Sequence, residues 1–209
     1  MANRYFITGT DTNVGKTVLS ALLCAALPAC YWKPIQTGSV DGTDRRQVID
    51  WTGISQEQAL PEAYIFDDPV SPHLAAECAG KEILLENIAV PPAATFPLVV
   101  EGAGGVLAPI NSHQFIADLI LHLRMPVVLA ARSTLGTINH TVMSLKVLRS
   151  YKIEVRGVVL IGPENPENKK AIEHYGSTQV IGQIPVLKTI NRETLCRVFA
   201  DHFQREAFR

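Results

Sequence analysis

The chain has 209 residues, of which 47% are hydrophobic and 19% are charged, a composition typical of a soluble globular protein with a full apolar core. Nineteen Lys and Arg residues against 20 Asp and Glu residues leave a formal net charge of −1, which argues against binding of nucleic acid or an anionic membrane through a positive field. The four cysteines show no CxxC spacing and no apolar run reaches the ~18 residues that cross a bilayer, so we expect one domain, residues 1–209, in a reducing cytoplasm.

Six short apolar runs predict the strands of a sheet. Polar residues do not alternate with the apolar ones, which is typical of parallel strands covered by helices on both faces. In chain order the runs span residues 5–8, 30–35, 98–101, 127–131, 155–161 and 180–184.

Helical patterns lie between and after these runs. Residues 17–27 are apolar almost all round, and residues 116–123 and 138–148 carry apolar stripes at helical spacing. A last stripe predicts a helix docked on the core rather than one lying on a membrane; its members are Leu195, Phe199 and Phe203.

Two stretches interrupt the alternation of strands and helices. Residues 67–72 and 91–97 contain several prolines and predict loops that bound an inserted helical region. The remaining order predicts an α/β fold, a three-layer sandwich with a mostly parallel central sheet and helices on both faces.

The strongest motif, Gly9-Thr-Asp-Thr-Asn-Val-Gly15-Lys16-Thr17, follows the first predicted strand and opens the first helix. Its glycines let backbone N–H groups converge on phosphate oxygens, its lysine suits the β- and γ-phosphates, and its threonine hydroxyl suits Mg²⁺. Five residues, not the usual four, separate Gly9 from the Gly15-Lys16 pair, so this is a variant phosphate-binding loop. A glycine-rich turn with a surface lysine is the alternative interpretation.

A second motif places a carboxylate, Glu101, and then Gly102, Ala103 and Gly104 at the end of the third predicted strand. A phosphate-loop enzyme needs an acidic group at this edge of the sheet to hold Mg²⁺ or its water. Read alone, the motif is equally well a strand end followed by a turn.

Two further charged residues, Lys33 and Asp44, lie at the end of the second predicted strand and after it. Lys33 is expected at the sheet edge where ligands bind, and its ammonium suits a phosphoryl group or an anionic substrate. Asp44 is a candidate metal ligand. Their alternative roles are a strand-end lysine that reaches solvent and a carboxylate that complements a helix dipole.

The segment Gly136-Thr137-Ile-Asn139-His140 opens the helix after the predicted strand at residues 127–131. Free N–H groups at a helix N-terminus suit an anionic ligand group. A glycine hinge with Thr137 as a helix cap is the alternative.

Five motifs in this order closely resemble the dethiobiotin synthetase family. They are the loop at residues 9–17, Lys-Pro-Ile-Gln-Thr-Gly at 33–38, Ser-Pro-His-Leu-Ala-Ala at 71–76, Glu-Gly-Ala-Gly-Gly at 101–105 and Leu-Gly-Thr-Ile-Asn-His at 135–140. The resemblance extends from Tyr5 to about Leu187. It implies a P-loop NTPase-type domain and an ATP- and Mg²⁺-dependent ligase of biotin synthesis, which joins 7,8-diaminononanoate and CO₂ in the ureido ring of dethiobiotin.

The resemblance also implies roles for individual residues. Lys16 and Lys33 are the expected catalytic groups, and Thr17, Asp44 and Glu101 the expected contacts to Mg²⁺. The expected ATP-binding residues are Asn13, Val14, Gly15, Lys16, Thr17, Val18, Asp44, Glu101, Gly102, Ala103, Gly104, Pro185, Val186 and Leu187. The expected substrate-binding residues are Thr12, Lys33, Thr37, Gly136, Thr137 and Asn139; the last three reach the substrate carboxylate across the interface of a homodimer, which is the expected assembly.

The sequence departs from the family where several relatives have an asparagine that reads adenine. Here the strand ends in Ile161, followed by Gly162 and Pro163. An apolar side chain cannot replace the donor and acceptor of an amide. We therefore expect weak selection of the base, so that several nucleoside triphosphates are accepted.

Two other classes share parts of this pattern. A nucleotide-switch ATPase of the partitioning and positioning type has a similar loop, but it carries a lysine near the loop's start, where this chain has Gly9-Thr10-Asp11. A synthetase that amidates a corrinoid side chain is the third interpretation, and 209 residues leave no room for the fused glutaminase domain of some relatives. The ordered motifs favour the dethiobiotin synthetase interpretation.

Overall fold

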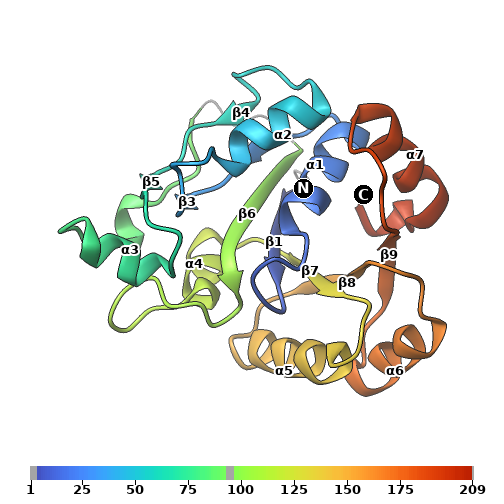
Figure 1. Cartoon of the computed structure of the whole chain (residues 1–209). Coiled ribbons are helices and arrows are strands. Elements are labelled where there is room, and N and C mark those ends of the chain that lie inside the picture. The colour runs from blue at the N-terminus through green and yellow to red at the C-terminus, as the bar shows by residue number, and fades with distance from the viewer. Residues whose placement is uncertain (1–3, 93–96, 209) are drawn as a thin grey trace.

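The computed structural model describes residues 4–92 and 97–208 (Figure 1). Its strands are β1 (Arg4–Gly9), β2 (Cys30–Trp32), β3 (Ile35–Gln36), β4 (Ala59–Leu60), β5 (Tyr64–Ile65), β6 (Leu98–Gly105), β7 (Val127–Arg132), β8 (Val155–Ile161) and β9 (Val180–Ile184). Its helices are α1 (Lys16–Ala26), α2 (Asp44–Thr52), α3 (Pro72–Cys78), η1 (Leu85–Asn87), α4 (Ile116–Leu123), α5 (Thr137–Ser150), α6 (Pro166–Gly176), α7 (Arg192–His202) and η2 (Arg205–Phe208).

Seven strands form the central sheet in the order β4-β2-β6-β1-β7-β8-β9, and every strand pair in it is parallel. The predicted parallel sheet is therefore confirmed. Because β1 lies between β6 and β7, the loop that follows it emerges at the middle of the carboxyl edge. Successive residues of each strand face opposite layers, which explains why the strands are apolar without alternation.

Helices cover both faces of the sheet, as predicted (Figure 1). One layer contains α1, α2 and α7, whose apolar side chains pack with Tyr5, Ile7 and Val99. The other contains α4, α5 and α6, which pack with Phe6 and Val100. The molecule is thus the predicted three-layer α/β sandwich.

The predicted C-terminal helix docks on the core. Leu195 and Phe199 are buried on α7, and Phe203, just after the helix, packs against Phe199 and Phe208. A Cβ at Gly182 would lie 2.5 Å from the ring of Phe203, so the ring rests directly on the backbone of β9.

Several boundaries differ from the prediction. The strand expected at 30–35 divides, because Pro34 has no N–H to donate to a ladder and its carbonyl instead accepts from the N–H groups of Ala63 and Tyr64. The strand expected to end at Glu101 continues through the glycines to Gly105. The loop expected at 67–72 ends one residue early, since Pro72 is the first residue of α3.

Several elements were not predicted. The largest is α6, although Asn165 caps it through the Asn168 N–H and Pro166 opens it, a recognisable start signal. The short strands β4 and β5 were also missed. The loop predicted at 91–97 includes residues 93–96, which lie outside the described residues. No helix in the described ranges has the length and hydropathy needed to cross a bilayer.

Candidate active site

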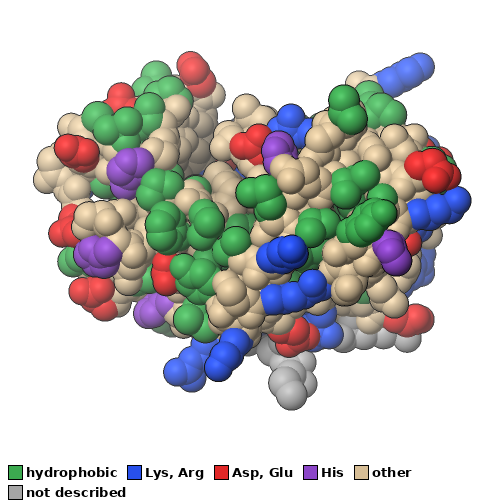
Figure 2. All heavy atoms as spheres, turned by 90° about the horizontal axis from the view of Figure 1, so that it is seen from below, with side chains coloured by type: hydrophobic (Ala, Val, Ile, Leu, Met, Phe, Trp, Pro, Cys, Tyr) green, Lys and Arg blue, Asp and Glu red, His purple; other side chains and the backbone are tan. Residues whose placement is uncertain are grey.

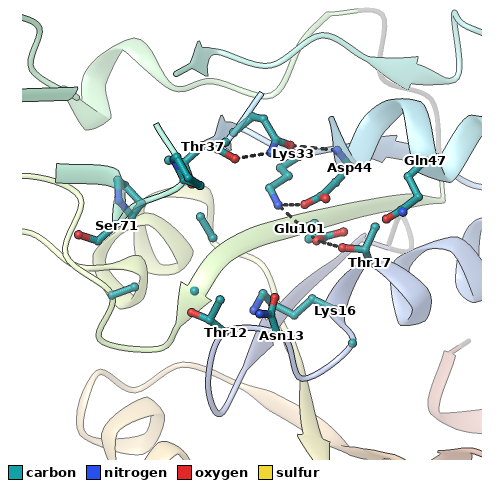
Figure 3. Close-up of a pocket in the computed structure, with 18 of the residues that line it drawn as sticks. Thr12, Asn13, Lys16, Thr17, Lys33, Thr37, Asp44, Gln47, Ser71 and Glu101 are labelled. Atoms are coloured by element: carbon teal, nitrogen blue, oxygen red, sulfur yellow. Dashed lines mark hydrogen bonds and ion pairs between the residues drawn. The ribbon is translucent and has the colours of Figure 1, made fainter. Parts of the chain in front are cut away.

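A cavity of about 690 Å³ opens at the carboxyl edge of the sheet (Figure 3). Parallel strands bring three predicted segments to this edge: the loop after β1, the residues after β2 and the end of β6. Lining residues that the sequence predicted are Thr12, Asn13, Gly15, Lys16, Thr17, Val18, Lys33, Thr37, Asp44, Glu101, Ala103 and Gly104. The fold therefore gathers most of the candidate residues in one place.

The loop between β1 and α1 has the backbone of an anion-binding turn. Gly15 caps α1 with φ 99°, and Asn13 has φ 57°, both in the left-handed region that glycine and asparagine tolerate best. As the N-cap residue, Gly15 has no side chain that could accept a hydrogen bond from the first N–H groups of α1. These donors and the helix dipole favour a phosphate here.

Lys16 bends over this loop and donates a hydrogen bond to the carbonyl of Asp11 at 3.0 Å. Only 7% of the residue is exposed. Burial lowers the pKa of Lys16 to about 8; the positive charge of Lys33 adds to this, while Glu101, Asp44 and Asp11 oppose it. A lysine in this state gains its full charge when an anion enters the site.

The lowered pKa makes nucleotide binding dependent on pH. A lysine with a pKa of about 8 is mostly charged below that value and mostly neutral above it. We expect the affinity for ATP, measured by equilibrium dialysis, to fall about tenfold between about pH 7 and about pH 9. Lys16→Arg keeps the charge over this range, so its affinity should stay constant; a wild-type affinity that does not change would contradict the assignment.

A chain of charged and polar groups lines the opposite wall of the cavity. The Lys33 ammonium donates to an Asp44 carboxylate oxygen and lies 3.5 Å from Glu101 Oε1. Thr17 donates its hydroxyl to the same Glu101 oxygen at 2.8 Å. Burial by itself lowers the pKa of Lys33, but the carboxylates of Glu101 and Asp44 outweigh it, so the pKa is raised and Lys33 stays charged.

Two polar residues that sequence reasoning missed hold this wall in place. Gln36 accepts a hydrogen bond from the Asp44 backbone N–H at 3.1 Å and donates to the Thr37 carbonyl at 2.7 Å. Tyr31, which is fully buried, donates its hydroxyl to Glu101 Oε2 at 3.0 Å. Gln36 belongs to the motif at residues 33–38 but was assigned no role, and Tyr31 was not predicted because an isolated polar residue in a strand carries no signal of its partner.

The oxygen atoms of Thr17, Asp44 and Glu101 suit Mg²⁺. Magnesium prefers hard oxygen ligands and is usually bound by one or two carboxylates together with substrate phosphates and water. No cluster of three or more His, Cys, Asp or Glu side chains with metal-binding geometry occurs within residues 4–92 and 97–208, so a metal here would depend on the nucleotide for further ligands. The donor set fits an ion that enters with ATP.

Other predicted residues lie away from this cavity. Gly136 and Asn139 are exposed at the start of α5, and Thr137 beside them is buried, with its hydroxyl 3.4 Å from that of Thr141. Val14 and Gly102 do not line the cavity, since Val14 is in the core and Gly102 packs against the ring of Phe6. The residues after β9 are also separate from it; they are Pro185, Val186 and Leu187.

Some lining residues were not assigned a role from the sequence. They include Gln47 and Trp51 on α2 and the segment that leads into α3, with Pro69, Val70, Ser71 and Pro72. Ser71 and Pro72 belong to one of the motifs that carried the resemblance, which is the signal that pointed to this segment. Gln47 and Trp51 carry no recognisable signal.

The family comparisons agree with this architecture. A family model described as an AAA domain matches residues 3–194. The chain is 45% identical over 208 residues to a protein of Brucella ovis named ATP-dependent dethiobiotin synthetase BioD, and 44% identical to one of Brucella abortus with the same name. In both cases the match covers 100% of this chain and 98% of the relative.

Solved structures show the same fold at low identity. A ParA family ATPase from Chlorobium tepidum has a TM-score of 0.55 at 13% identity, over 94% of this chain and 90% of the other. The MinC:MinD cell division complex of Aquifex aeolicus has a TM-score of 0.55 at 15% identity, over 94% of this chain and 86% of the other. These likenesses extend to the fold alone.

Proposed function

The chain belongs to the ATP-dependent dethiobiotin synthetase family, and from this membership we propose that it converts 7,8-diaminononanoate, CO₂ and ATP into dethiobiotin, ADP and phosphate. The observation that carries the proposal is the position of Lys33, which lies on the cavity wall facing the phosphate-binding loop and is held by Asp44 and Glu101. A phosphate loop needs one lysine to bind ATP. A second buried lysine suits an additional anion in the same cavity.

The reaction proceeds in three chemical steps. One amine of the diamine adds to CO₂ and forms a carbamate. A carbamate oxygen then attacks the γ-phosphorus of ATP, which releases ADP and leaves a carbamic–phosphoric mixed anhydride. The second amine attacks the carbonyl carbon, the bond to the phosphate oxygen breaks, and the ureido ring closes with release of phosphate and protons.

The residues of the cavity supply what these steps require. Negative charge accumulates where the carbamate meets the γ-phosphate, and Lys16 and Lys33 offset it from two different segments. The N–H groups at the start of α1 hold the triphosphate, while Thr12 and Thr37 contact the diamine or its carbamate. Because both lysines are nearly buried, their charges act in a site with little water to screen them.

Magnesium is the proposed metal, held by Thr17, Asp44 and Glu101 together with the nucleotide. When bound, it supplies a positive charge that neutralises the phosphate oxygens. Glu101 and Asp44 meanwhile keep Lys33 charged and oriented toward the cavity. The phosphate-binding loop would thus hold the triphosphate, and the residues around Lys33 would hold the metal and the carbamate.

We propose that two chains form a homodimer through the face that carries α5. On this side of the molecule Leu135 is 99% exposed and Met143 57% exposed, and Leu107 and Met143 line a hollow of about 360 Å³ beside Thr12. Figure 2, which views the molecule from below relative to Figure 1, shows hydrophobic side chains gathered near the centre of this face. Covering them with a second copy brings Gly136, Thr137 and Asn139 toward the partner's substrate, whose carboxylate they would bind.

The dimer is tested by charge substitution on this face. In sedimentation experiments we expect the wild-type chain to be a dimer, with twice the 22.8 kDa mass of one chain, and Met143→Asp to be a monomer of 22.8 kDa. The reason is that a desolvated carboxylate opposes association. Tyr175→Asp is the matched control, since Tyr175 is 67% exposed on α6. A dimeric Met143→Asp variant, or a monomeric wild-type chain, would contradict the proposed interface.

The nucleotide preference remains a prediction. Ile161 ends β8 and packs over the loop, where a Cβ at Gly15 would lie only 2.9 Å from Ile161 Cδ1. Because this side chain offers no hydrogen bond to a base, we expect kcat/KM with GTP and CTP to be comparable to that with ATP, within about tenfold. A larger preference for ATP, in a coupled assay of each nucleotide, would show that other groups read the adenine.

We further propose that residues 1–209 act as one P-loop α/β domain in the cytoplasm, whose partners are its small-molecule substrates and a second copy of the chain, with no nucleic acid or membrane bound. The reaction itself is tested with [¹³C]bicarbonate, ATP, Mg²⁺ and the diamine. Dethiobiotin that carries the label, formed only when ATP is present, is the expected result in mass spectrometry. Unlabelled or absent product would overturn the proposal.

A further inference from the structure

Glu101 has two oxygen atoms with different surroundings. Oε1 accepts from the Thr17 hydroxyl at 2.8 Å and lies 3.5 Å from Lys33 Nζ, so it belongs to the cavity wall. Oε2 accepts from the hydroxyl of Tyr31 at 3.0 Å. The carboxylate therefore has hydrogen-bond donors on both of its oxygen atoms, and these donors fix the orientation of its plane.

The sheet explains how a residue 70 positions away reaches this carboxylate. Tyr31 on β2 pairs with Val99 on β6, and Glu101 lies two residues further along the same strand. Side chains two residues apart on a strand point to the same face, so the Tyr31 ring runs along that face toward the carboxyl edge. Its hydroxyl meets the carboxylate where the apolar layer ends and the cavity begins.

Burial makes this contact important for the orientation of Glu101. The exposed fraction of Glu101 is 1% and that of Tyr31 is 0%, so water does not compete for Oε2. A buried charged oxygen without a donor is unfavourable, and the carboxylate would therefore rotate toward another donor. The Lys33 ammonium and the Thr17 hydroxyl are the neighbouring donors, and rotation would take Oε1 from its present position.

We propose that Tyr31 is a positioning residue that fixes Glu101 for magnesium binding by holding Oε2 and leaving Oε1 toward the cavity. The inference rests on the proposed Mg²⁺- and ATP-dependent function. Outer groups that orient a metal ligand contribute about 10- to 100-fold to metal affinity or activity. Tyr31 acts through Glu101 and does not itself touch the substrate.

The chain contains a matched control for this hydroxyl. Tyr5 on β1 pairs with the same Val99 from the other side, is 1% exposed and packs in the same apolar layer. Its hydroxyl is buried without a hydrogen-bond partner among the described residues. Tyr5→Phe and Tyr31→Phe thus remove the same atom at the same level of the sheet, but only the second removes a contact to Glu101.

The test uses electron paramagnetic resonance to measure the binding of Mn²⁺ to the enzyme in the presence of ADP. Mn²⁺ substitutes for Mg²⁺, and the measurement needs no turnover. We expect Tyr31→Phe to raise the dissociation constant about tenfold and Tyr5→Phe to leave it unchanged. In a steady-state assay, Tyr31→Phe should raise the Mg²⁺ concentration for half-maximal rate more than it lowers kcat. A wild-type affinity in Tyr31→Phe, or an equal loss in Tyr5→Phe, would overturn the inference.

A second comparison separates positioning from packing. In a Glu101→Gln background, adding Tyr31→Phe should weaken Mn²⁺ binding no further, whereas an unchanged tenfold loss would show that Tyr31 acts independently of Glu101 and would overturn the inference. If the wild-type chain with ADP binds no Mn²⁺, the proposed metal site fails and the inference fails with it. Normal wild-type binding with no effect of Tyr31→Phe refutes the inference alone.

Discussion

Lys33→Gln is expected to lower kcat by about 100- to 1,000-fold and to leave ATP binding nearly unchanged. Glutamine keeps most of the length of the side chain and a hydrogen-bond donor, but it removes the positive charge. Lys33 is only 6% exposed, and its ammonium faces the phosphate-binding loop across the cavity. The transferring phosphoryl group and the carbamate then lose one of the two lysine charges that offset their negative charge. ATP binding depends mainly on the loop and on Lys16, which the substitution leaves in place.

The measurement is steady-state formation of dethiobiotin together with ATP affinity by equilibrium dialysis. Lys169→Gln, an exposed lysine on α6, removes the same formal charge and should have no effect on either quantity. Retained turnover in Lys33→Gln would remove this residue from the mechanism. A loss of ATP affinity as large as the loss of turnover would instead assign it to nucleotide binding.

Glu101→Gln is expected to lower the free energy of unfolding by about 3 kcal/mol and to abolish most activity. Glu101 is buried beside Lys33, and removing one partner of a buried ion pair leaves the other charge uncompensated, which typically costs about 3–5 kcal/mol. The lower end applies because Asp44 still neutralises Lys33. The amide also lacks the negative charge that would attract magnesium.

Urea unfolding gives the stability change, and an activity titration with Mg²⁺ gives the functional one. Glu82→Gln, at an exposed position, is the control and should remain within about 0.5 kcal/mol of the wild type. A Glu101→Gln variant as stable as the wild type would contradict the buried ion pair. Full activity at ordinary Mg²⁺ concentrations would contradict its role as a metal ligand.

Local patterns in the sequence were sufficient for the phosphate loop and for most of the sheet. The strands at residues 155–161 and 180–184 match β8 and β9 without adjustment, because buried parallel strands are continuous apolar runs. The phosphate-loop motif also predicted the elements on either side of it, because such a loop joins a strand to the start of a helix. Lys33 and Glu101 could then be placed at the same edge by the geometry of parallel strands.

Contacts between distant segments could not be predicted in this way. That Lys33 bridges Asp44 and Glu101 depends on β2 lying directly beside β6, and the sequence does not give strand order. The hydrogen bonds of the Tyr31 hydroxyl and the Gln36 amide depend in addition on the register of the strands. The division of the second strand at Pro34 was visible in the residue type, but the pairing of β3 with β5 was not.

The most direct test of the account is the coupling of ATP cleavage to ring closure in the purified protein with ATP, Mg²⁺ and bicarbonate. ADP release should begin only when 7,8-diaminononanoate is added, and each ADP should be matched by one phosphate and one dethiobiotin, followed by mass spectrometry. ATP hydrolysis that is indifferent to the diamine and yields no dethiobiotin would contradict the account, and would leave Lys33 and Thr37 as structural residues at the edge of an ATPase site.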